Sequence, residues 1–508
     1  MENVISYLKE IFLFDKDAPL IFTQFYFWGF FTIVFGIYIA IHKRIALRNI
    51  FLFIVSVFFY YKTSGFYFFL LLFSTVTDYY IGNSIYKSEN ISKRKLLVTV
   101  SIFINLFVLS YFKYSYFFID TVNYIFNTDI AVIDVFAKWT NNFAGTHFSI
   151  DKIILPVGIS FYTFQTISYS IDIYRKKLEP VKNVLDFGFY VSFFPQLVAG
   201  PIVRASEFIP QIYKEFKLTK EEFGMAVFLI LNGLLKKMFI SDYIAVNFID
   251  RVFSNPMMYG GFENLMSLYA YSVQVYCDFS GYTDIAIGVA LLMGFRLPQN
   301  FNSPYKAVSL GEFWKRWHMS LSSWLKDYLY IPLGGNKKSE LRTNINLMIT
   351  MLLGGLWHGA SWQFVIWGGL NGIGLVFYKY WRKISPFKNS NHWLVRVYAI
   401  FLTFNFITFT RIWFRADSME IANSIIYQIT NAFDFSKIGI MIIAYWKVFI
   451  MILLAMVIHW LPTNIKDKYK QIFIQTPNLV KVAVVTVVIF IIYQVRSADI
   501  QPFIYFQF

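Results

Sequence analysis

The chain has 508 residues, of which 57% are hydrophobic and 15% are charged, whereas an average soluble domain has roughly 25% charged residues. Aromatic residues make up 21% of the chain, which excludes a disordered protein and is more than one soluble core buries. The net charge of +16 favours basic loops that orient membrane helices over a nucleic-acid surface. A single cysteine, Cys277, excludes an internal disulfide and a multi-thiolate metal site.

The first apolar segment, residues 18–42, contains no Asp, Glu, Lys or Arg and is long enough to cross a bilayer. Acidic residues such as Asp15 precede it, and the basic residues Lys43 and Arg44 follow it. Basic flanks stay on the cytoplasmic side of a membrane. We therefore predict an uncleaved first crossing with the N-terminus outside the cytoplasm.

Further apolar runs alternate with basic loops along the chain, and the loops around Lys93 and Lys176 fall on the cytoplasmic side when each run counts as one crossing. We predict about eleven to twelve crossings. No internal repeat or soluble domain is visible, which predicts one membrane-embedded domain over residues 1–508. The later candidate spans are 49–61, 63–81, 96–112, 153–171, 223–240, 264–295 (expected to be broken), 343–357, 361–378, 397–414, 438–461 and 480–495.

The apolar run at residues 187–203 differs from the others because Pro195 and the pair Gly200-Pro201 interrupt it. Both of its ends carry basic neighbours and therefore look cytoplasmic. This pattern predicts a re-entrant hairpin. Its freed backbone groups must be buried in protein or face a water-filled cavity, and we expect a cavity here.

His358 lies in the uncharged stretch 343–378, beside glycines at 354, 355 and 359. Ionisable groups at membrane depth are costly and usually functional. The glycines permit a helix break or a close backbone approach, which opens space for a substrate beside the imidazole. The alternative is a helix-packing face of small residues with a hydrogen-bonded core histidine.

His318 lies in an aromatic and charged segment, residues 314–328. At 100° per residue Trp314, Trp317, His318 and Leu321 share one face, which predicts a helix lying at the membrane interface. An amphipathic surface helix explains the tryptophans and the basic residues better than it explains the histidine. For the remaining histidines we expect interfacial or structural roles: His42, His147, His392 and His459.

Other chemistries have weaker signals. Asp278 and Asp284 are six residues apart and so point away from each other on a continuous helix. A proton relay is one interpretation of them, and capping or holding a broken helix is the other. No P-loop, HExxH or GxSxG motif appears, so the usual ATPase, zinc-protease and serine-hydrolase signatures are absent.

Five segments, taken in order and spacing, resemble the membrane-bound O-acyltransferase family (MBOAT). The resemblance is to the bacterial branch that contains alginate O-acetylation proteins and peptidoglycan O-acetyltransferases. It covers roughly residues 150–415. The segments are PVGISFYTFQ at 156–165, FFPQLVAGPI at 193–202, DFSGYTD at 278–284, WHMSLSSW at 317–324 and WHG at 357–359.

The resemblance implies an all-α polytopic fold, in which a ring of helices and re-entrant segments surrounds a central tunnel. It further implies a bacterial inner-membrane location, acetyl-CoA as a donor that enters from the cytoplasm and is not tightly bound, and a polysaccharide acceptor on the other side. A separate extracytoplasmic acetyltransferase of the SGNH type is the implied partner.

The resemblance matches His358 to the family's near-invariant histidine and His318 to its second catalytic position. A neutral imidazole suits a thioester acyl transfer, because a base with a pKa near 7 activates the acceptor hydroxyl. We expect His358 to be that base and His318 to position the thioester or stabilise developing charge. No metal is expected. Expected supporting residues are Trp357, Trp317, Asp327, Asn371, Pro195, Gly200, Pro201 and Asp278. Expected contacts to the phosphates of CoA are Lys315, Arg316, Lys337 and Lys338.

Two other functions fit parts of the same pattern. D-alanyl transfer from a carrier protein to teichoic acid is a related activity, but the segment 193–202 reads as the acetylating branch. A polysaccharide transporter or flippase fits the number of helices and the re-entrant segment. The lack of an internal repeat and the paired histidine motifs argue against it.

Overall fold

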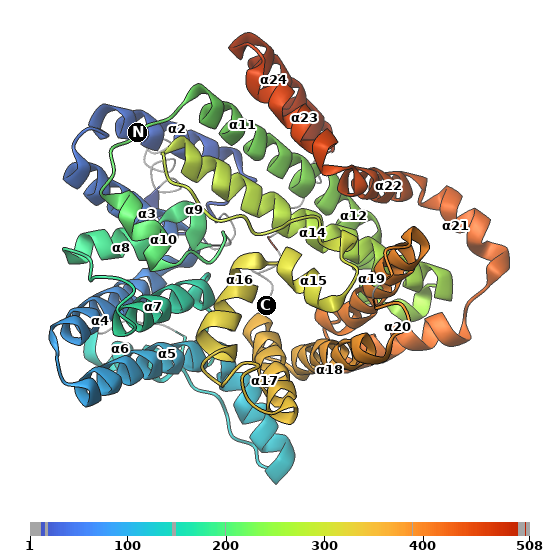
Figure 1. The fold of residues 1–508 in the computed structure, drawn as a ribbon, viewed down its shortest axis with the longest axis horizontal. Helices are drawn as coiled ribbons and strands as arrows, with labels where there is room; N and C mark the ends of the chain where they lie inside the picture. The colour runs from blue at the N-terminus through green and yellow to red at the C-terminus, as the bar shows by residue number, and fades with distance from the viewer. Residues whose placement is uncertain are drawn as a thin grey trace. The chain divides into compact units, whose positions relative to one another are not determined.

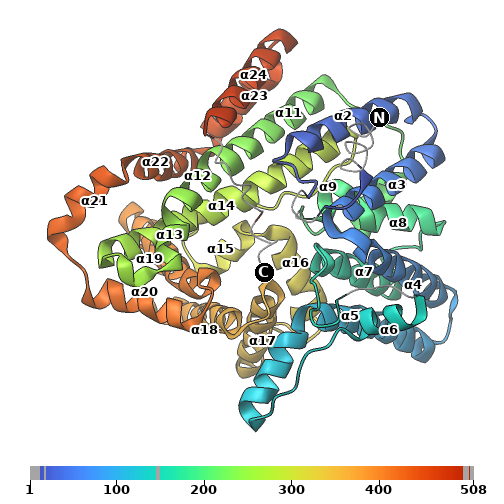
Figure 2. The same cartoon turned by 180° about the vertical axis from the view of Figure 1, so that it is seen from behind.

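In the computed structural model, residues 12–15, 19–144, 149–198, 200–388, 390–495 and 503 are described. Every regular element in these ranges is a helix, and no strand occurs among them (Figures 1 and 2). The predicted all-α fold class is confirmed.

Five described helical segments are long and apolar enough to cross a membrane, and two bent helix pairs raise that number to seven. The protein is therefore a multi-pass membrane protein. The predicted eleven to twelve crossings also count shorter apolar helices, such as Phe25–Ile41, so their number stays a prediction. The five segments are Ile45–Lys87, Ile91–Phe126, Lys220–Ser254, Gly261–Leu292 and Trp393–Arg415. The side of the membrane on which the N-terminus lies also stays a prediction, because residues 1–11 and 16–18 lie outside the described ranges.

The helices group into two compact units. Unit 1 consists of Met1–Val198, Ile202–Phe216 and Gly359–Ser361, and unit 2 consists of Ala199–Pro201, Lys217–His358 and Trp362–Phe508. The single membrane-embedded domain stays a prediction.

Unit 1 is built around α7, whose residues from Ile159 to Ser170 are all buried. Some of the polar groups inside this unit are hydrogen-bonded to one another. Asp78 of α4 accepts hydrogen bonds from Ser101 at 2.5 Å and from Asn105 at 2.7 Å, both on α5. The unit's helices are α2 (Phe25–Ile41), α3 (Ile45–Ser64), η1 (Gly65–Tyr67), α4 (Phe68–Lys87), α5 (Ile91–Phe126), α6 (Val135–Ala144), α7 (Ile159–Tyr174), α8 (Val184–Ser192), α9 (Phe194–Leu197) and α10 (Ala205–Ile212).

The break predicted in the apolar run 187–203 is present. α8 ends at Ser192, and α9 begins at Phe194 with Pro195 in its first turn. The Phe194 N–H donates to Ser56 Oγ at 3.2 Å, and Gln196 Nε2 donates to the Tyr190 carbonyl at 2.7 Å. Protein groups therefore satisfy polar atoms at the break, as such a segment requires. The re-entrant path and the cavity expected there stay predictions.

Unit 2 holds the remaining helices, and α14 is its most buried element. α11 and α14 lie side by side (Figures 1 and 2), because Gly233 and Gly281 let their backbones approach closely. The unit's helices are α11 (Lys220–Leu234), η2 (Leu235–Ser241), α12 (Asp242–Ile244), η3 (Ala245–Ile249), α13 (Asp250–Ser254), η4 (Pro256–Met258), α14 (Gly261–Leu292), η5 (Pro304–Lys306), α15 (Leu310–Arg316), α16 (Met319–Leu325), η6 (Lys326–Tyr330), α17 (Glu340–His358), α18 (Trp362–Ile384), α19 (Trp393–Arg415), α20 (Met419–Asn431), η7 (Phe435–Lys437), α21 (Ile438–Ala444), α22 (Trp446–Trp460), α23 (Thr463–Gln475) and α24 (Asn478–Val495).

The break predicted within residues 264–295 is wrong, because α14 continues for 32 residues. Its carboxylates do not hold a broken helix. Lys237 Nζ lies 2.6 Å from Asp278 and 2.7 Å from Asp242, and Lys236 Nζ lies 2.7 Å from Asp284. The two lysines are consecutive in the π-helical turn η2, and their ion pairs neutralise the carboxylates of α14 without ending it.

α17 and α18 form a closely packed helix pair. A methyl group added at Gly355 would come within 2.3 Å of the Phe364 carbonyl oxygen and 3.1 Å of Gly368 Cα. Small residues at such a contact let two helix backbones approach. Helix packing therefore accounts for Gly355, and the same pair of helices places His358 at the end of α17.

Candidate active site

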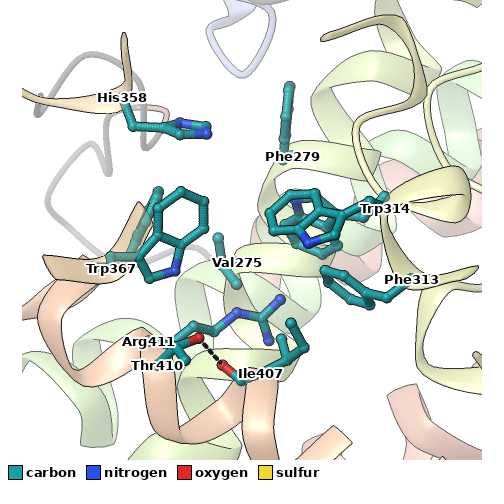
Figure 3. Close-up of a pocket in the computed structure, with 11 residues that line it drawn as sticks. Val275, Phe279, Phe313, Trp314, His358, Trp367, Ile407, Thr410 and Arg411 are labelled. Atoms are coloured by element: carbon teal, nitrogen blue, oxygen red, sulfur yellow. Dashed lines mark hydrogen bonds between the residues drawn. The ribbon is translucent and has the colours of Figure 1, made fainter. Parts of the chain in front are cut away.

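A small pocket lies inside unit 2, with walls from α14, α15, α17, α18 and α19 (Figure 3). Its lining is mostly aromatic. The volume open to the centre of a water molecule is about 20 Å³, which is about one water molecule's worth of space. The lining residues are Val275, Phe279, Phe313, Trp314, Trp317, His358, Trp367, Ile407, Thr410, Arg411 and Phe414.

His358 borders this pocket from the C-terminal end of α17 and is 4% exposed. Three rings surround its imidazole. The distances between ring centroids are 5.1 Å to Trp357, 5.1 Å to Trp367 and 5.2 Å to Phe414. Aromatic packing of this kind fixes the ring's orientation and limits the access of water.

The single interfacial helix predicted around His318 is wrong. α15 ends at Arg316 and α16 starts at Met319, so Trp314 and Leu321 belong to different helices. His318 between them has φ 44° and ψ 55°, the left-handed conformation, which an α-helix of L-residues cannot contain. His318 is also 1% exposed and is therefore buried in the protein.

The strained backbone at His318 is held by Asn300. The Asn300 carbonyl accepts from the Met319 N–H at 2.9 Å. Its side-chain oxygen accepts from the Ser320 N–H at 3.1 Å and from Ser320 Oγ at 2.9 Å. A non-glycine residue kept in this conformation by several hydrogen bonds is typical of functional sites.

The same amide oxygen determines the tautomer of His318. Its Nδ1 lies 3.2 Å from Asn300 Oδ1, and an amide oxygen only accepts hydrogen bonds, so Nδ1 carries the proton. His318 lies outside the candidate membrane-spanning helices, and burial lowers its pKa to about 3. The imidazole is therefore neutral at physiological pH, and its Nε2 is the basic nitrogen.

The structure brings the two predicted catalytic histidines together. Their ring centroids are 6.5 Å apart, and the Trp357 ring lies 6.0 Å from that of His318. His318 is not itself a lining residue, but its ring packs at 4.7 Å against Phe279, which lines the pocket. The histidines therefore stand at one site, with His358 closer to the open space.

Two more predicted supporting residues lie at this pocket. Trp317 lines it. Asn371 is fully buried, and its Nδ2 donates to the Trp367 carbonyl at 2.9 Å and to Thr410 Oγ1 at 3.4 Å. Because Trp367 and Thr410 both line the pocket, Asn371 joins two of its walls.

The other predicted supporting residues do not line the pocket. Pro195 belongs to unit 1. Asp278 is fully buried and paired with Lys237. Asp327 lies in η6 and is half-buried. Gly200 and Pro201, which group with unit 2, are also absent from the lining.

None of the basic residues predicted to attract CoA phosphates lines the pocket. Lys315, Lys337 and Lys338 are exposed. The Arg316 guanidinium is already paired with Glu312 at 2.8 Å. Phosphate binding by these side chains stays a prediction.

The remaining histidines are not at the pocket. His42 and His392 lie at or near the surface. His459 is 3% exposed, and its Nε2 accepts a hydrogen bond from the Tyr305 N–H at 3.1 Å, which is a structural contact. His147 lies outside the described residues.

Sequence reasoning missed Arg411, which lines the pocket from α19 and is 5% exposed. Its Nη1 donates to Tyr305 Oη at 2.9 Å, and its guanidinium lies 4.8 Å from the centre of the Trp317 ring. The signal was available, because Arg411 is an ionisable residue inside the apolar run 397–414, and such residues are functional candidates by default. Sequence reasoning also missed Trp367 and Phe414.

Buried histidines at an aromatic pocket, in a chain of membrane-spanning helices, are the arrangement that a membrane-embedded acid–base enzyme requires. Residues 175–416, which include the whole pocket lining, match the model of the MBOAT, membrane-bound O-acyltransferase family.

Curated relatives agree with this match. The peptidoglycan O-acetyltransferase of Helicobacter pylori is 34% identical over 448 residues, which cover 83% of this chain and 80% of that protein. The probable alginate O-acetylase AlgI of Pseudomonas aeruginosa is 38% identical, over 77% of this chain and 71% of that protein. The teichoic acid D-alanyltransferase of Bacillus subtilis is 32% identical over a shorter stretch, 51% of this chain and 68% of that protein. The chain belongs to the membrane-bound O-acyltransferase family and is an O-acyltransferase.

Proposed function

We propose that this enzyme transfers acetyl groups from a cytoplasmic thioester donor, acetyl-CoA, for the O-acetylation of an extracytoplasmic polysaccharide. We place it in a bacterial inner membrane, with a separate extracytoplasmic transferase of the SGNH type as its partner. The names of the Helicobacter pylori and Pseudomonas aeruginosa relatives support acetyl transfer. The observation that carries the proposal is the pair of buried histidines 6.5 Å apart, with His358 on the pocket.

In the proposed reaction His358 acts as the general base. The acceptor hydroxyl oxygen attacks the thioester carbonyl carbon while the imidazole takes the hydroxyl proton. A C–O bond forms, and the carbonyl π electrons move to the carbonyl oxygen. When that oxyanion collapses, the C=O bond re-forms, the C–S bond breaks, and the sulfur leaves with the proton that His358 returns. No covalent acyl-enzyme is needed.

His318 has a narrower role in this scheme. Because its Nδ1–H is directed at Asn300, its Nε2 accepts hydrogen bonds and does not donate one to an oxyanion. We therefore assign His318 to positioning, beside Trp357 and Phe279, whose rings it contacts.

The test measures base-labile acetate on purified envelope polysaccharides from cells with the wild-type gene, a deletion, His358→Ala or His318→Ala. Membrane levels of each variant are followed by immunoblot. His392→Ala is the matched control, because His392 is an exposed histidine at the start of α19.

We expect acetate to disappear from one polymer in the deletion and in His358→Ala, while the protein still accumulates and His392→Ala behaves as wild type. Unchanged acetate on every polymer after deletion would refute acetylation of those polymers. Loss of D-alanyl esters instead would assign the chain to the teichoic acid branch.

A further inference from the structure

We propose that Arg411 is a catalytic residue whose guanidinium binds the thioester carbonyl oxygen as that oxygen becomes negatively charged. This inference rests on the acetyl transfer proposed above. It assigns a function to the one lining residue of the pocket that carries a permanent positive charge.

Arg411 is a buried cation without a carboxylate partner among the described residues. Its contacts there are the hydroxyl of Tyr305 and the ring faces of Tyr305 and Trp317, at 5.3 and 4.8 Å from the guanidinium carbon. Arg415, one turn later on the same helix, is different, because its guanidinium pairs with Asp250 at 2.9 Å and with Asp417 at 3.4 Å. A buried charge is normally paired, so Arg411, which has no carboxylate partner in the described part of the chain, needs another explanation.

The position of the guanidinium suits an anion that forms inside the pocket. Figure 3 shows it reaching into the space that His358 also borders. Its Nη1 is held by Tyr305 Oη, which in turn donates to the Ser272 carbonyl of α14. No other described group accepts a hydrogen bond from Arg411. Its remaining N–H groups are therefore available to a ligand in a fixed orientation.

The size of the pocket favours a carbonyl oxygen over a larger anion. The volume open to the centre of a water molecule, about 20 Å³, accommodates one small group, whereas the carboxylate of a sugar ring would have to enter with the ring. The Nδ1 proton of the neighbouring His318 is directed at Asn300, which leaves Nε2 an acceptor, so an oxyanion needs a different donor. Among the lining residues Arg411 is the strongest available donor.

The low-polarity walls increase the effect of the charge. Six of the eleven lining residues are Phe or Trp, and a charge pair interacts more strongly where water is excluded. In the ground state the carbonyl oxygen is neutral and gains little from the guanidinium. In the tetrahedral intermediate it carries the electron pair from the C=O bond, so the interaction acts mainly on the transition state.

The experiment measures kcat and KM for acetyl-CoA in proteoliposomes, with the acceptor polymer identified by the acetate analysis. The variants are Arg411→Gln, Arg411→Lys and Tyr305→Phe, which removes the hydroxyl that orients the guanidinium. Arg415→Gln is the control, because Arg415 lies on the same helix but outside the pocket. Thermal unfolding of each detergent-purified variant is measured in parallel.

We expect Arg411→Gln to lower kcat about 10²- to 10³-fold with KM within about threefold of wild type. Arg411→Lys should lower kcat less than Arg411→Gln does, because lysine keeps the positive charge but lacks the planar guanidinium. Tyr305→Phe should lower kcat about tenfold or less. Arg415→Gln should retain kcat within about threefold, because the ion pairs that Arg415 forms contribute to the stability of the protein and not to the reaction.

A folded Arg411→Gln with wild-type kcat would overturn the inference, and so would a rise in KM without a change in kcat, which marks ground-state anion binding. If Arg411→Gln does not accumulate, Arg411→Lys and Tyr305→Phe decide, and wild-type kcat in both overturns it. The proposed function fails separately, if deletion of the gene leaves acetate unchanged on every polymer, so the two failures are distinguishable.

Discussion

Unit 2 contains two regions of buried or half-buried basic residues, and the partners of these residues differ. Lys236 and Lys237 lie on η2, and each has a carboxylate from α14 within 2.7 Å. Arg411 on α19 has a tyrosine hydroxyl and two aromatic faces, but no carboxylate among the described residues. The paired lysines do not line the pocket, whereas Arg411 does.

This difference distinguishes charged residues that stabilise the fold from a charged residue that acts on the substrate. Removing one partner of a buried ion pair leaves an uncompensated charge and weakens the fold. Removing a charge that has no carboxylate partner leaves no uncompensated charge behind. It mainly weakens the stabilisation of the anion that the charge binds. We therefore expect substitutions in the first region to change stability, and substitutions at the pocket to change rate.

The largest effect is expected for Lys237→Met, which removes the cation that forms ion pairs with Asp278 and Asp242. The free energy of unfolding should fall by about 3 kcal/mol or more, measured as thermal unfolding of the detergent-purified protein and as its level in membranes. The double variant Lys237→Met with Asp278→Leu should recover part of that loss. A Lys237→Met protein with unchanged stability would contradict the structural role of this region.

His318→Asn tests the pocket side of the comparison. Asparagine tolerates the left-handed backbone conformation, so the fold should keep its stability within about 1 kcal/mol while acetyl transfer falls about 10²-fold. The control is Lys176→Asn, because Lys176 also has a positive φ, 59°, and is not a lining residue. Equal losses of activity in both variants would show that backbone strain, and not the imidazole, matters.

Gly355→Ala should destabilise the protein by about 1–3 kcal/mol, because the new methyl group would meet the Phe364 carbonyl oxygen at 2.3 Å. Part of the activity should also be lost, since α17 carries His358. Gly369→Ala on the same helix pair is the control, because its methyl group would meet only Leu352 Cδ2, at 3.6 Å. Unfolding midpoints that do not differ between the two variants would argue against close packing at Gly355.

The smallest effect is expected for the double variant Lys337→Ala with Lys338→Ala. Both side chains are exposed and lie outside the pocket lining, so solvent screens their charges. The KM for acetyl-CoA should rise about twofold at low salt and not at all at high salt. A salt-independent tenfold rise would show instead that these lysines bind the CoA phosphates directly.

Much of the site was predictable because its residues occupy unusual positions in the chain. His358 stands out as an ionisable group in an uncharged stretch, and the structure places it on the pocket. The broken run at residues 187–203 was predicted from Pro195 and the pair Gly200-Pro201, since proline disrupts a helix whatever its tertiary surroundings. The small residue at 355 was correctly associated with close helix approach, one of the two alternatives for that segment.

Other predictions failed because they depended on neighbours distant in the sequence. The helix around His318 was expected to be continuous, but Asn300 holds its backbone in a left-handed turn. The break expected in α14 is absent, and the carboxylates that were expected to hold it form ion pairs with Lys236 and Lys237 of η2. Neither Asn300 nor the two lysines belong to the sequence segment whose structure they affect, so a local sequence pattern does not reveal them.

The sequence by itself determined the class of the protein, because hydrophobic length and basic loops decide membrane insertion locally, and the histidine motifs indicated acyl transfer. Only the tertiary structure decided which buried charges are paired and which face the pocket. Both properties depend on contacts within 3 Å between residues that are far apart in the chain, such as the ion pair of Lys237 with Asp278 or the hydrogen bond from Arg411 to the Tyr305 hydroxyl. The difference between charges that are paired and a charge that faces the pocket is the reason for assigning a catalytic role to Arg411.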